Sequence, residues 1–150
     1  MKKSAILLML AGLWWACNSI SSPAGESPSG DDQQHSHTVG LMLNNGQKWR
    51  ADMSTNENVA SLCTIARDFA GDTHTGLTDY QVLDRGLQKG FDKMIRECGM
   101  EGAGHDALHL WLEPLLVNMN ELKKVDNTAS AGKIFAAIHE RLELYTQYFE

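Results

Sequence analysis

Apolar side chains recur at intervals of three or four residues in four successive segments between residues 54 and 149. This spacing places them on one face of an α-helix, and such a face must be buried against other elements. The positions are Val59, Leu62, Cys63, Ala66, Phe69 and Ala70, then Tyr80, Leu83, Leu87, Phe91, Met94, Ile95 and Cys98, then Leu108, Trp111, Leu112, Leu115, Leu116, Met119 and Leu122, and finally Ala131, Ile134, Phe135, Ile138, Leu142, Tyr145 and Phe149. Because the connections between the segments are short, the pattern predicts an all-α protein, an antiparallel four-helix bundle.

Residues typical of helix ends separate these segments. Ser54-Thr55-Asn56-Glu57 and Thr78-Asp79-Tyr80-Gln81 have the order of a capping box, and Gly71 and Gly99 follow the last apolar positions of the first two segments. We therefore expect the first two helices to end at these glycines. The third helix is expected at about 105–125 and the fourth at about 129–149, with a turn at residues 126–128.

Glycine and proline inside the helices predict two local features. Gly86 and Gly90 lower helix propensity by about 1 kcal/mol each, and their spacing of four predicts a close contact with another helix. Pro114 removes the backbone bond to the carbonyl of Leu110 and is expected to bend the third helix.

A short β-hairpin is expected before the first helix. Asn45-Gly46 is a favoured pair for a tight turn with both central residues at positive φ, and the flanking residues 38–43 and 47–51 suit short strands. A hairpin alone is marginally stable in water, so it should pack on the bundle through Val39, Leu41 and Leu43, which share one face, and through Trp49.

The first 37 residues have a different composition. Lys2 and Lys3 precede an apolar run from Ala5 to Ala16, which is shorter than the roughly 20 residues of a membrane-spanning helix. Residues 18–37 are rich in Ser, Pro, Gly, Asp and Gln, which predicts a flexible tether. The sequence therefore predicts a signal peptide at 1–16, a flexible tether at 17–37 that begins with Cys17, and a folded domain at 38–150.

Leu13-Trp14-Trp15-Ala16-Cys17 resembles the processing site of bacterial lipoproteins, whose type II signal peptide is cut before a cysteine that becomes lipidated. The resemblance implies an acylated Cys17 as the membrane contact, and Asn18 implies transport to the outer membrane, facing the periplasm or the cell surface. Each buried CH₂ of an acyl chain contributes about 0.8 kcal/mol, so several chains form a lasting anchor. An ordinary cleaved secretory signal is the alternative.

Two further segments, at residues 43–49 and 98–112, are similar to segments of small uncharacterised helical lipoproteins of Gram-negative bacteria. That resemblance implies no activity. The charge balance also excludes one class of partner: the chain has 13 Lys and Arg against 19 Asp and Glu, a net charge of −6. Nucleic acid is not expected as a partner, because binding it requires clustered cations.

Potential metal ligands are concentrated between the second and third helices. Cys98, Met100, His105 and His109 lie close together in the chain, and Met94 is one helical turn before Cys98. His105 and His109 have the i, i+4 spacing that puts two imidazoles on one helix face. Sulfur ligands combined with imidazole favour Cu(I), and thiolate with imidazole also suits Zn²⁺, so we expect binding of copper before zinc.

Other interpretations of these residues remain open. The glycines near residue 100 can serve turn geometry, and the histidines can be incidental to a bundle that contacts a partner protein of the cell envelope. A non-covalent haem held by His139 with Met94 or Met119 is a third hypothesis.

Catalysis is not expected. The sequence from His105 to His109 resembles the zinc-protease motif His-Glu-x-x-His, but Asp106 is shorter than the catalytic Glu and no third ligand follows at the required spacing. A disulfide between Cys63 and Cys98 is disfavoured as well. If the first two helices form a hairpin, the two cysteines are about 20 Å apart along the axis, whereas a disulfide needs Cα atoms within about 7 Å.

Overall fold

A computed structural model of the chain describes residues 40–73 and 76–150. The chain divides into two units, residues 1–35 and residues 36–150, and the described residues all belong to the second. The predicted signal peptide, the predicted lipid anchor at Cys17, the predicted tether and Val39 lie outside the described residues. No helix in the described part is both long enough and apolar enough to cross a membrane.

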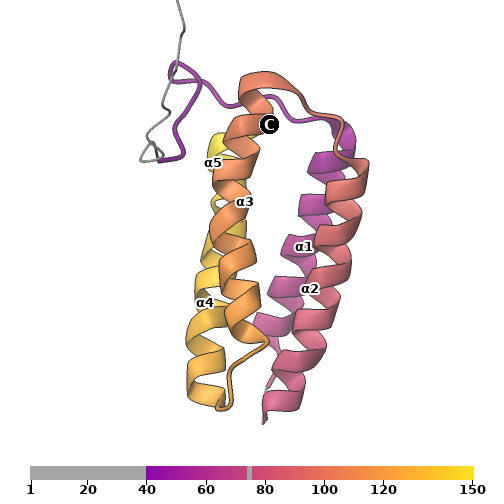
Figure 1. The fold of residues 1–150 in the computed structure, drawn as a ribbon, viewed down its shortest axis with the longest axis vertical. Coiled ribbons are helices and arrows are strands. Elements are labelled where there is room, and N and C mark those ends of the chain that lie inside the picture. Colours follow the sequence, from indigo (N-terminus) through magenta and orange to yellow (C-terminus); the bar gives the residue numbers. More distant parts are fainter. Residues whose placement is uncertain (1–39, 74–75) are drawn as a thin grey trace, which may run out of the picture. The chain divides into compact units, whose positions relative to one another are not determined.

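Four long helices and one short one make up the described part of the domain. They are α1 (Met53–Gly71), α2 (Leu77–Glu97), α3 (Gly102–Leu122), α4 (Thr128–Glu143) and the single turn α5 (Tyr145–Tyr148). The four long helices lie side by side, and successive helices run in opposite directions (Figure 1). The prediction of a helical bundle is confirmed, and no β-strand is present among the residues that are described.

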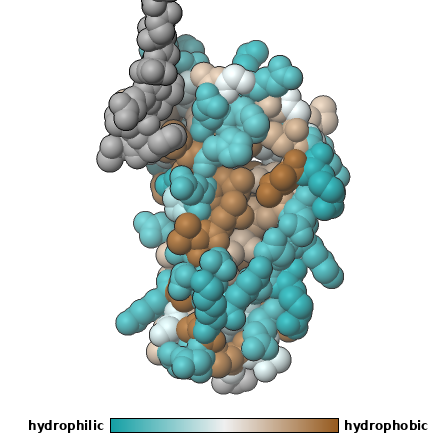
Figure 2. Space-filling view, viewed as in Figure 1, coloured by the Kyte–Doolittle hydropathy of each residue, from teal (hydrophilic) through white to brown (hydrophobic). Residues whose placement is uncertain are grey.

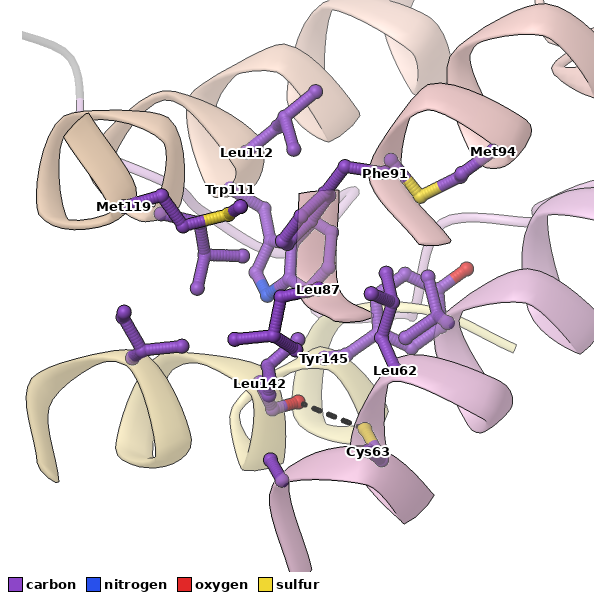
Figure 3. Close-up of a cluster of buried hydrophobic side chains, with 14 of the residues drawn as sticks. Leu62, Cys63, Leu87, Phe91, Met94, Trp111, Leu112, Met119, Leu142 and Tyr145 are labelled. Atoms are coloured by element: carbon purple, nitrogen blue, oxygen red, sulfur yellow. Dashed lines mark hydrogen bonds between the residues drawn. The ribbon is translucent and has the colours of Figure 1, made fainter. Parts of the chain in front are cut away.

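The predicted apolar stripes form one hydrophobic core. Its largest fully buried side chains include Trp111, Phe91, Leu62, Leu87 and Met94, which come from α1, α2 and α3 and point toward one another (Figure 3). Tyr145 packs edge-on against the Trp111 ring, with the two ring centroids 5.0 Å apart. Truncating a buried aromatic side chain of this kind to Ala costs about 3–5 kcal/mol of folding free energy.

The predicted close approach at the α2 glycines is confirmed at Gly90. A Cβ added to Gly90 would lie 2.5 Å from Leu62 Cδ2, whereas one added to Gly86 would meet Ile65 Cγ2 at 3.8 Å. Of the two glycines, Gly90 is therefore the one at which a larger residue would force the Leu62 side chain on α1 to move.

Pro114 lies inside α3, and the carbonyl that it deprives of a helical bond has another donor. The Arg141 guanidinium on α4 donates from Nη2 to the Leu110 carbonyl at 2.8 Å and from Nε to the Trp111 carbonyl at 3.1 Å. In return, the Trp111 indole N–H donates to the Arg141 carbonyl at 2.9 Å. Half-burial of Arg141 lowers its pKa below the usual value through desolvation. These three bonds join α3 to α4 where the proline interrupts the helical ladder.

Several predicted helix boundaries are wrong by a few residues. The N-cap of α1 is Asp52 rather than Ser54, because the Asp52 carboxylate accepts from Thr55 N–H at 2.6 Å. The third helix begins at Gly102 instead of residue 105, with Gly102 at φ +64°, and ends at Leu122 instead of residue 125. The last predicted helix is interrupted at Leu144, and its final predicted residue, Phe149, is extended.

Four side chains predicted to be buried are exposed instead. Ile95 is 54% exposed and Leu116 is 39% exposed, and Ala70 and Leu43 are exposed as well. Ile95 lines a small pocket between α2 and α3, and Leu116 lines an open hollow bordered by residues of α3.

The predicted hairpin is reduced to its turn. Asn45 and Gly46 have φ of 52° and 84°, as expected, and Asn44 and Gln47 exchange two backbone bonds. The strands do not continue past this pair. Instead Trp49 pairs in parallel with Phe149, because the extended chain end offers it backbone partners on both sides.

Candidate metal site at the junction of α2 and α3

The linker between α2 and α3 positions the predicted sulfur ligands. Helix α2 ends at Glu97, and Cys98 N–H still donates to the Met94 carbonyl at 2.9 Å. Cys98 itself is extended, with φ −65° and ψ 118°, so the chain turns away from the helix axis there. The thiol is half-buried and free, and it lies beside the hydrophobic core.

His105 and His109 form a pair on the first turns of α3. Their Nε2 atoms are 3.1 Å apart, and their ring centroids are 4.5 Å apart with a tilt of 52°. At this separation one ring donates a hydrogen bond and the other accepts it, so at least one imidazole is neutral. The predicted placement of both rings on one face of the helix is confirmed.

A small pocket brings four of the predicted ligand residues together. It has a volume of about 60 Å³ and is lined by Met94, Ile95, Cys98, His105, Leu108, His109 and Leu112. Met100 lies elsewhere: it is buried in the core, with its terminal methyl 3.5 Å from where a Cβ on Gly104 would be. Met94, rather than Met100, is the thioether that borders the pocket.

These side chains are not arranged as a complete coordination sphere. Over residues 40–73 and 76–150, no group of three or more His, Cys, Asp and Glu side chains is close enough to hold a metal ion. The histidine pair is the one preformed part of the predicted ligand set, and Cys98 would have to turn toward it.

A second hollow continues from the small pocket along α3. It has a volume of about 450 Å³ and is lined by His109, Leu112, Glu113, Leu116, Val117 and Asn120. Figure 2 shows apolar surface on this face of the bundle, framed by hydrophilic side chains. His109 and Leu112 belong to both hollows, so the histidine pair lies at one end of an open apolar groove.

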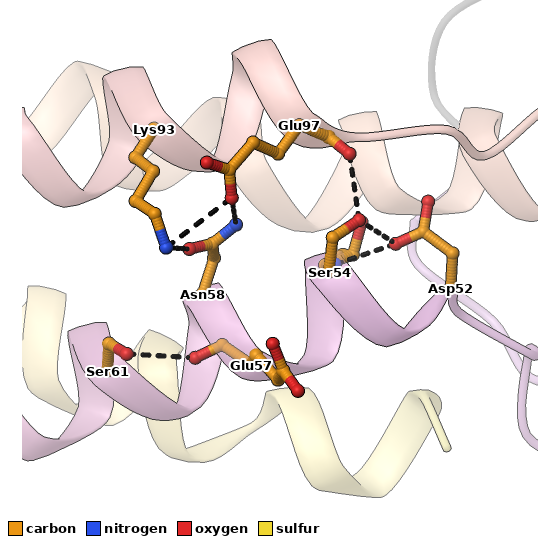
Figure 4. Close-up of polar contacts among 8 residues, drawn as sticks. Asp52, Ser54, Glu57, Asn58, Ser61, Lys93 and Glu97 are labelled. Carbon is orange, nitrogen blue, oxygen red and sulfur yellow. Dashed lines mark hydrogen bonds and ion pairs between the residues drawn. The ribbon is translucent and has the colours of Figure 1, made fainter.

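Asp52 holds the linker from the opposite side, a role that the sequence did not reveal. Its carboxylate accepts hydrogen bonds from Thr55 N–H, Ser54 Oγ and, at 2.6 Å, Gly99 N–H. Ser54 Oγ also lies 2.8 Å from the Glu97 carbonyl, to which it can donate (Figure 4). Burial alone would raise the pKa of Asp52, but these hydrogen bonds outweigh it and lower that pKa.

A neighbouring polar cluster ties the end of α2 to α1. Asn58 donates to the Glu97 carboxylate at 2.9 Å and accepts from Lys93 at 2.8 Å, and Lys93 lies 3.4 Å from Glu97 (Figure 4). The hydrogen bond from Asn58, followed by the contacts to Lys93, lowers the pKa of Glu97. The spacing of one helical turn could have predicted the contact between Lys93 and Glu97. Nothing in the local sequence indicated that Asn58 joins them.

The remaining candidate residues lie outside this pocket. Cys63 is buried and unpaired, with its thiol 3.7 Å from the Leu142 carbonyl (Figure 3), and burial raises its pKa. Cys98 is a free thiol as well, so the two cysteines of the described residues are not paired. His139 stacks on Phe135 and has its Nε2 3.7 Å from Glu143, so its contacts are with its own helix.

Comparison with known proteins assigns no family: no family model, no curated protein and no solved structure matches the chain.

Proposed function

We propose that this domain binds a soft transition metal, Cu(I) before Zn²⁺, without catalysing a reaction, and that lipid on Cys17 anchors it to the outer membrane. The ligands in this proposal are His105 and His109 with Cys98 and Met94. The distance of 3.1 Å between the two Nε2 atoms is the observation that carries it.

Two imidazoles that bind one ion must bring their nitrogens close together. Nitrogens about 2.0–2.1 Å from a tetrahedral ion are about 3.3 Å from each other. The apo pair is within a few tenths of an ångström of that separation, so an ion can replace the hydrogen bond with little movement of α3. Neutral imidazole is also the form that binds metals.

Sulfur on the opposite wall of the pocket favours copper. Cys98 and Met94 both border the pocket, and thiolate with thioether is a donor set that selects Cu(I). Met94 is only 1% exposed and packs in the core, whereas Cys98 is half-buried. A rotation of the Cys98 side chain toward the histidines would complete a three- or four-coordinate site.

The size of the pocket fits the proposed ion. The pocket between the ligands has about 60 Å³, which suits a metal ion held by side chains of its walls.

A contact module for an envelope protein is the competing function, and the apolar groove along α3 is the feature that favours it. Such a module would use Leu116 and Val117 and would have no need of a facing imidazole pair. A non-covalent haem is the third hypothesis, and it would require His139 to leave Phe135 and Glu143.

A competition titration with a chromogenic Cu(I) chelator, on the full-length protein in detergent micelles, tests the proposal. The variant His105→Ala/His109→Ala and the variant Cys98→Ser should each lose affinity at least about tenfold, which corresponds to 1.4 kcal/mol. His139→Ala is the matched control, because it removes a half-buried histidine from another helix. Equal Cu(I) affinity in the wild type and the double-histidine variant would refute the metal site.

The anchor is tested separately by metabolic labelling with palmitate. Wild-type protein should incorporate the label and Cys17→Ala should not. Label retained in the variant would contradict lipidation at Cys17.

A further inference from the structure

The first turn of α1 holds the chain on both sides of Cys98. Asp52 Oδ2 accepts from Gly99 N–H at 2.6 Å, and the Ser54 hydroxyl donates to the Glu97 carbonyl at 2.8 Å. Cys98 lies between these two bonded neighbours. Without them, its backbone would keep only the bond from Cys98 N–H to Met94 at the end of α2.

We infer that Asp52 is a positioning residue for the metal site: by accepting the Gly99 N–H, its carboxylate fixes the linker so that Cys98 stays on the wall of the pocket that His105 and His109 also line. This inference rests on the proposed function. Asp52 does not border the pocket and would not touch the ion.

The geometry suits a strong tether. Hydrogen bonds from backbone N–H to a carboxylate are about twice as strong as neutral ones, and they are correspondingly short. Both oxygens of Asp52 are used: Oδ1 accepts from Thr55 N–H, while Oδ2 accepts from Gly99 N–H. One side chain thus caps α1 and holds the α2–α3 linker.

The residue at position 99 fits this contact. A Cβ added to Gly99 would lie 3.2 Å from Asp52 Oδ2, which is tighter than an ordinary contact. Glycine therefore allows the carboxylate to approach the linker backbone closely. Because ligand groups must be held within about 0.5 Å of productive geometry, loss of the tether should weaken metal binding.

Asp52→Asn separates the two roles of this side chain. Asparagine caps helices about as well as aspartate, so its Oδ1 can still accept from Thr55 N–H. Its NH₂ group would then face Gly99 N–H, placing a donor against a donor. The variant should keep α1 capped and lose only the tether to the linker.

Asn127→Ala is the matched control. The Asn127 side chain caps α4 by accepting from Ser130 N–H at 2.8 Å, at the other end of the bundle from the linker. This variant loses helix-cap stabilisation without touching the linker. It therefore reports what general destabilisation does to the site.

Three measurements on the full-length protein test the inference. In Asp52→Asn the Gly99 amide should exchange with solvent at least about tenfold faster, because its short hydrogen bond is lost. The Cys98 thiol of the metal-free protein should react faster with an alkylating reagent, with the label located by peptide mass spectrometry. Cu(I) affinity should fall about tenfold. Asn127→Ala should leave all three at wild-type values.

Either of two results would overturn the inference. In the first, Asp52→Asn has the same amide exchange rate, thiol reactivity and Cu(I) affinity as the wild type. In the second, Asp52→Asn and Asn127→Ala change these three quantities equally. Failure of the proposed function is distinguishable, because it appears as absence of Cu(I) binding in the wild type. The amide-exchange and thiol-reactivity measurements use metal-free protein. They therefore show whether Asp52 fixes the linker even if the wild type binds no Cu(I).

Discussion

The two glycines of α2 allow one substitution to be tested in two environments of the same helix. Replacing a helical Gly by Ala stabilises the folded state by about 0.5–1 kcal/mol when the new methyl group meets no obstacle. At Gly86 the new Cβ would meet Ile65 Cγ2 at 3.8 Å, an ordinary van der Waals distance. We therefore expect Gly86→Ala to raise the melting temperature by about 2–8 °C for a domain of this size.

At Gly90 the same methyl group would lie 2.5 Å from Leu62 Cδ2 and 3.2 Å from Leu62 Cγ. Leu62 is fully buried, so a movement of its side chain away from the new methyl group must disturb neighbouring core side chains. Overpacking of this kind costs about 1–3 kcal/mol, which outweighs the gain in helix propensity. Gly90→Ala should be destabilised by up to about 2 kcal/mol relative to the wild type.

Thermal and urea denaturation of the wild type and both variants measure this difference, and circular dichroism at 222 nm is a suitable signal. The two variants share their helix, their chemistry and their effect on the unfolded chain, so the sign of their difference reports packing alone. Equal stabilisation of both variants would refute the close approach of α1 and α2 at Gly90.

Two further predictions concern buried polar groups. Asp84 is 8% exposed, and within the described residues its Oδ1 has no hydrogen-bond partner. Desolvation raises its pKa despite the nearby Lys123 and Arg85, so the folded state binds this proton more tightly than the unfolded state. The contribution of Asp84 to the free energy of unfolding therefore falls as pH rises from about 4 through the folded-state pKa. Asp84→Asn should be more stable than the wild type by about 1 kcal/mol near pH 7 but not at pH 3. Calorimetry across pH measures this effect, and an identical profile for the exposed control Asp92→Asn would contradict it. Arg141→Met should cost about 1–3 kcal/mol in urea denaturation, because the Leu110 carbonyl freed by Pro114 loses its donor; a loss no larger than that of the exposed control Lys133→Met would contradict this role.

Much of the bundle was predictable because its signals are local. Apolar spacing identified the four long helices, Asn45-Gly46 identified the turn, and the i, i+4 spacing placed His105 and His109 on one face. Each of these depends on residues at most a few positions apart, where backbone geometry alone fixes which side chains are neighbours.

The errors in the prediction arise where a distant segment competes with a local one. Ser54 was expected to cap α1, but its hydroxyl bonds Asp52 and the Glu97 carbonyl, and Asp52 is the cap. The last helix was expected to continue, but the extended chain around Phe149 pairs with Trp49. Sequence spacing carries no information about such partners.

The sequence by itself therefore determined the helices, their apolar faces and a group of soft ligands between the second and third helices. Only the tertiary structure decided that Met94 rather than Met100 borders the pocket, that Arg141 serves the carbonyl freed by Pro114, and that Asp52 holds the linker at Gly99. The physical reason is that each of these contacts depends on how helices distant in the chain are aligned along the bundle. That alignment is set by packing of the whole core, at contacts such as Leu62 against Gly90.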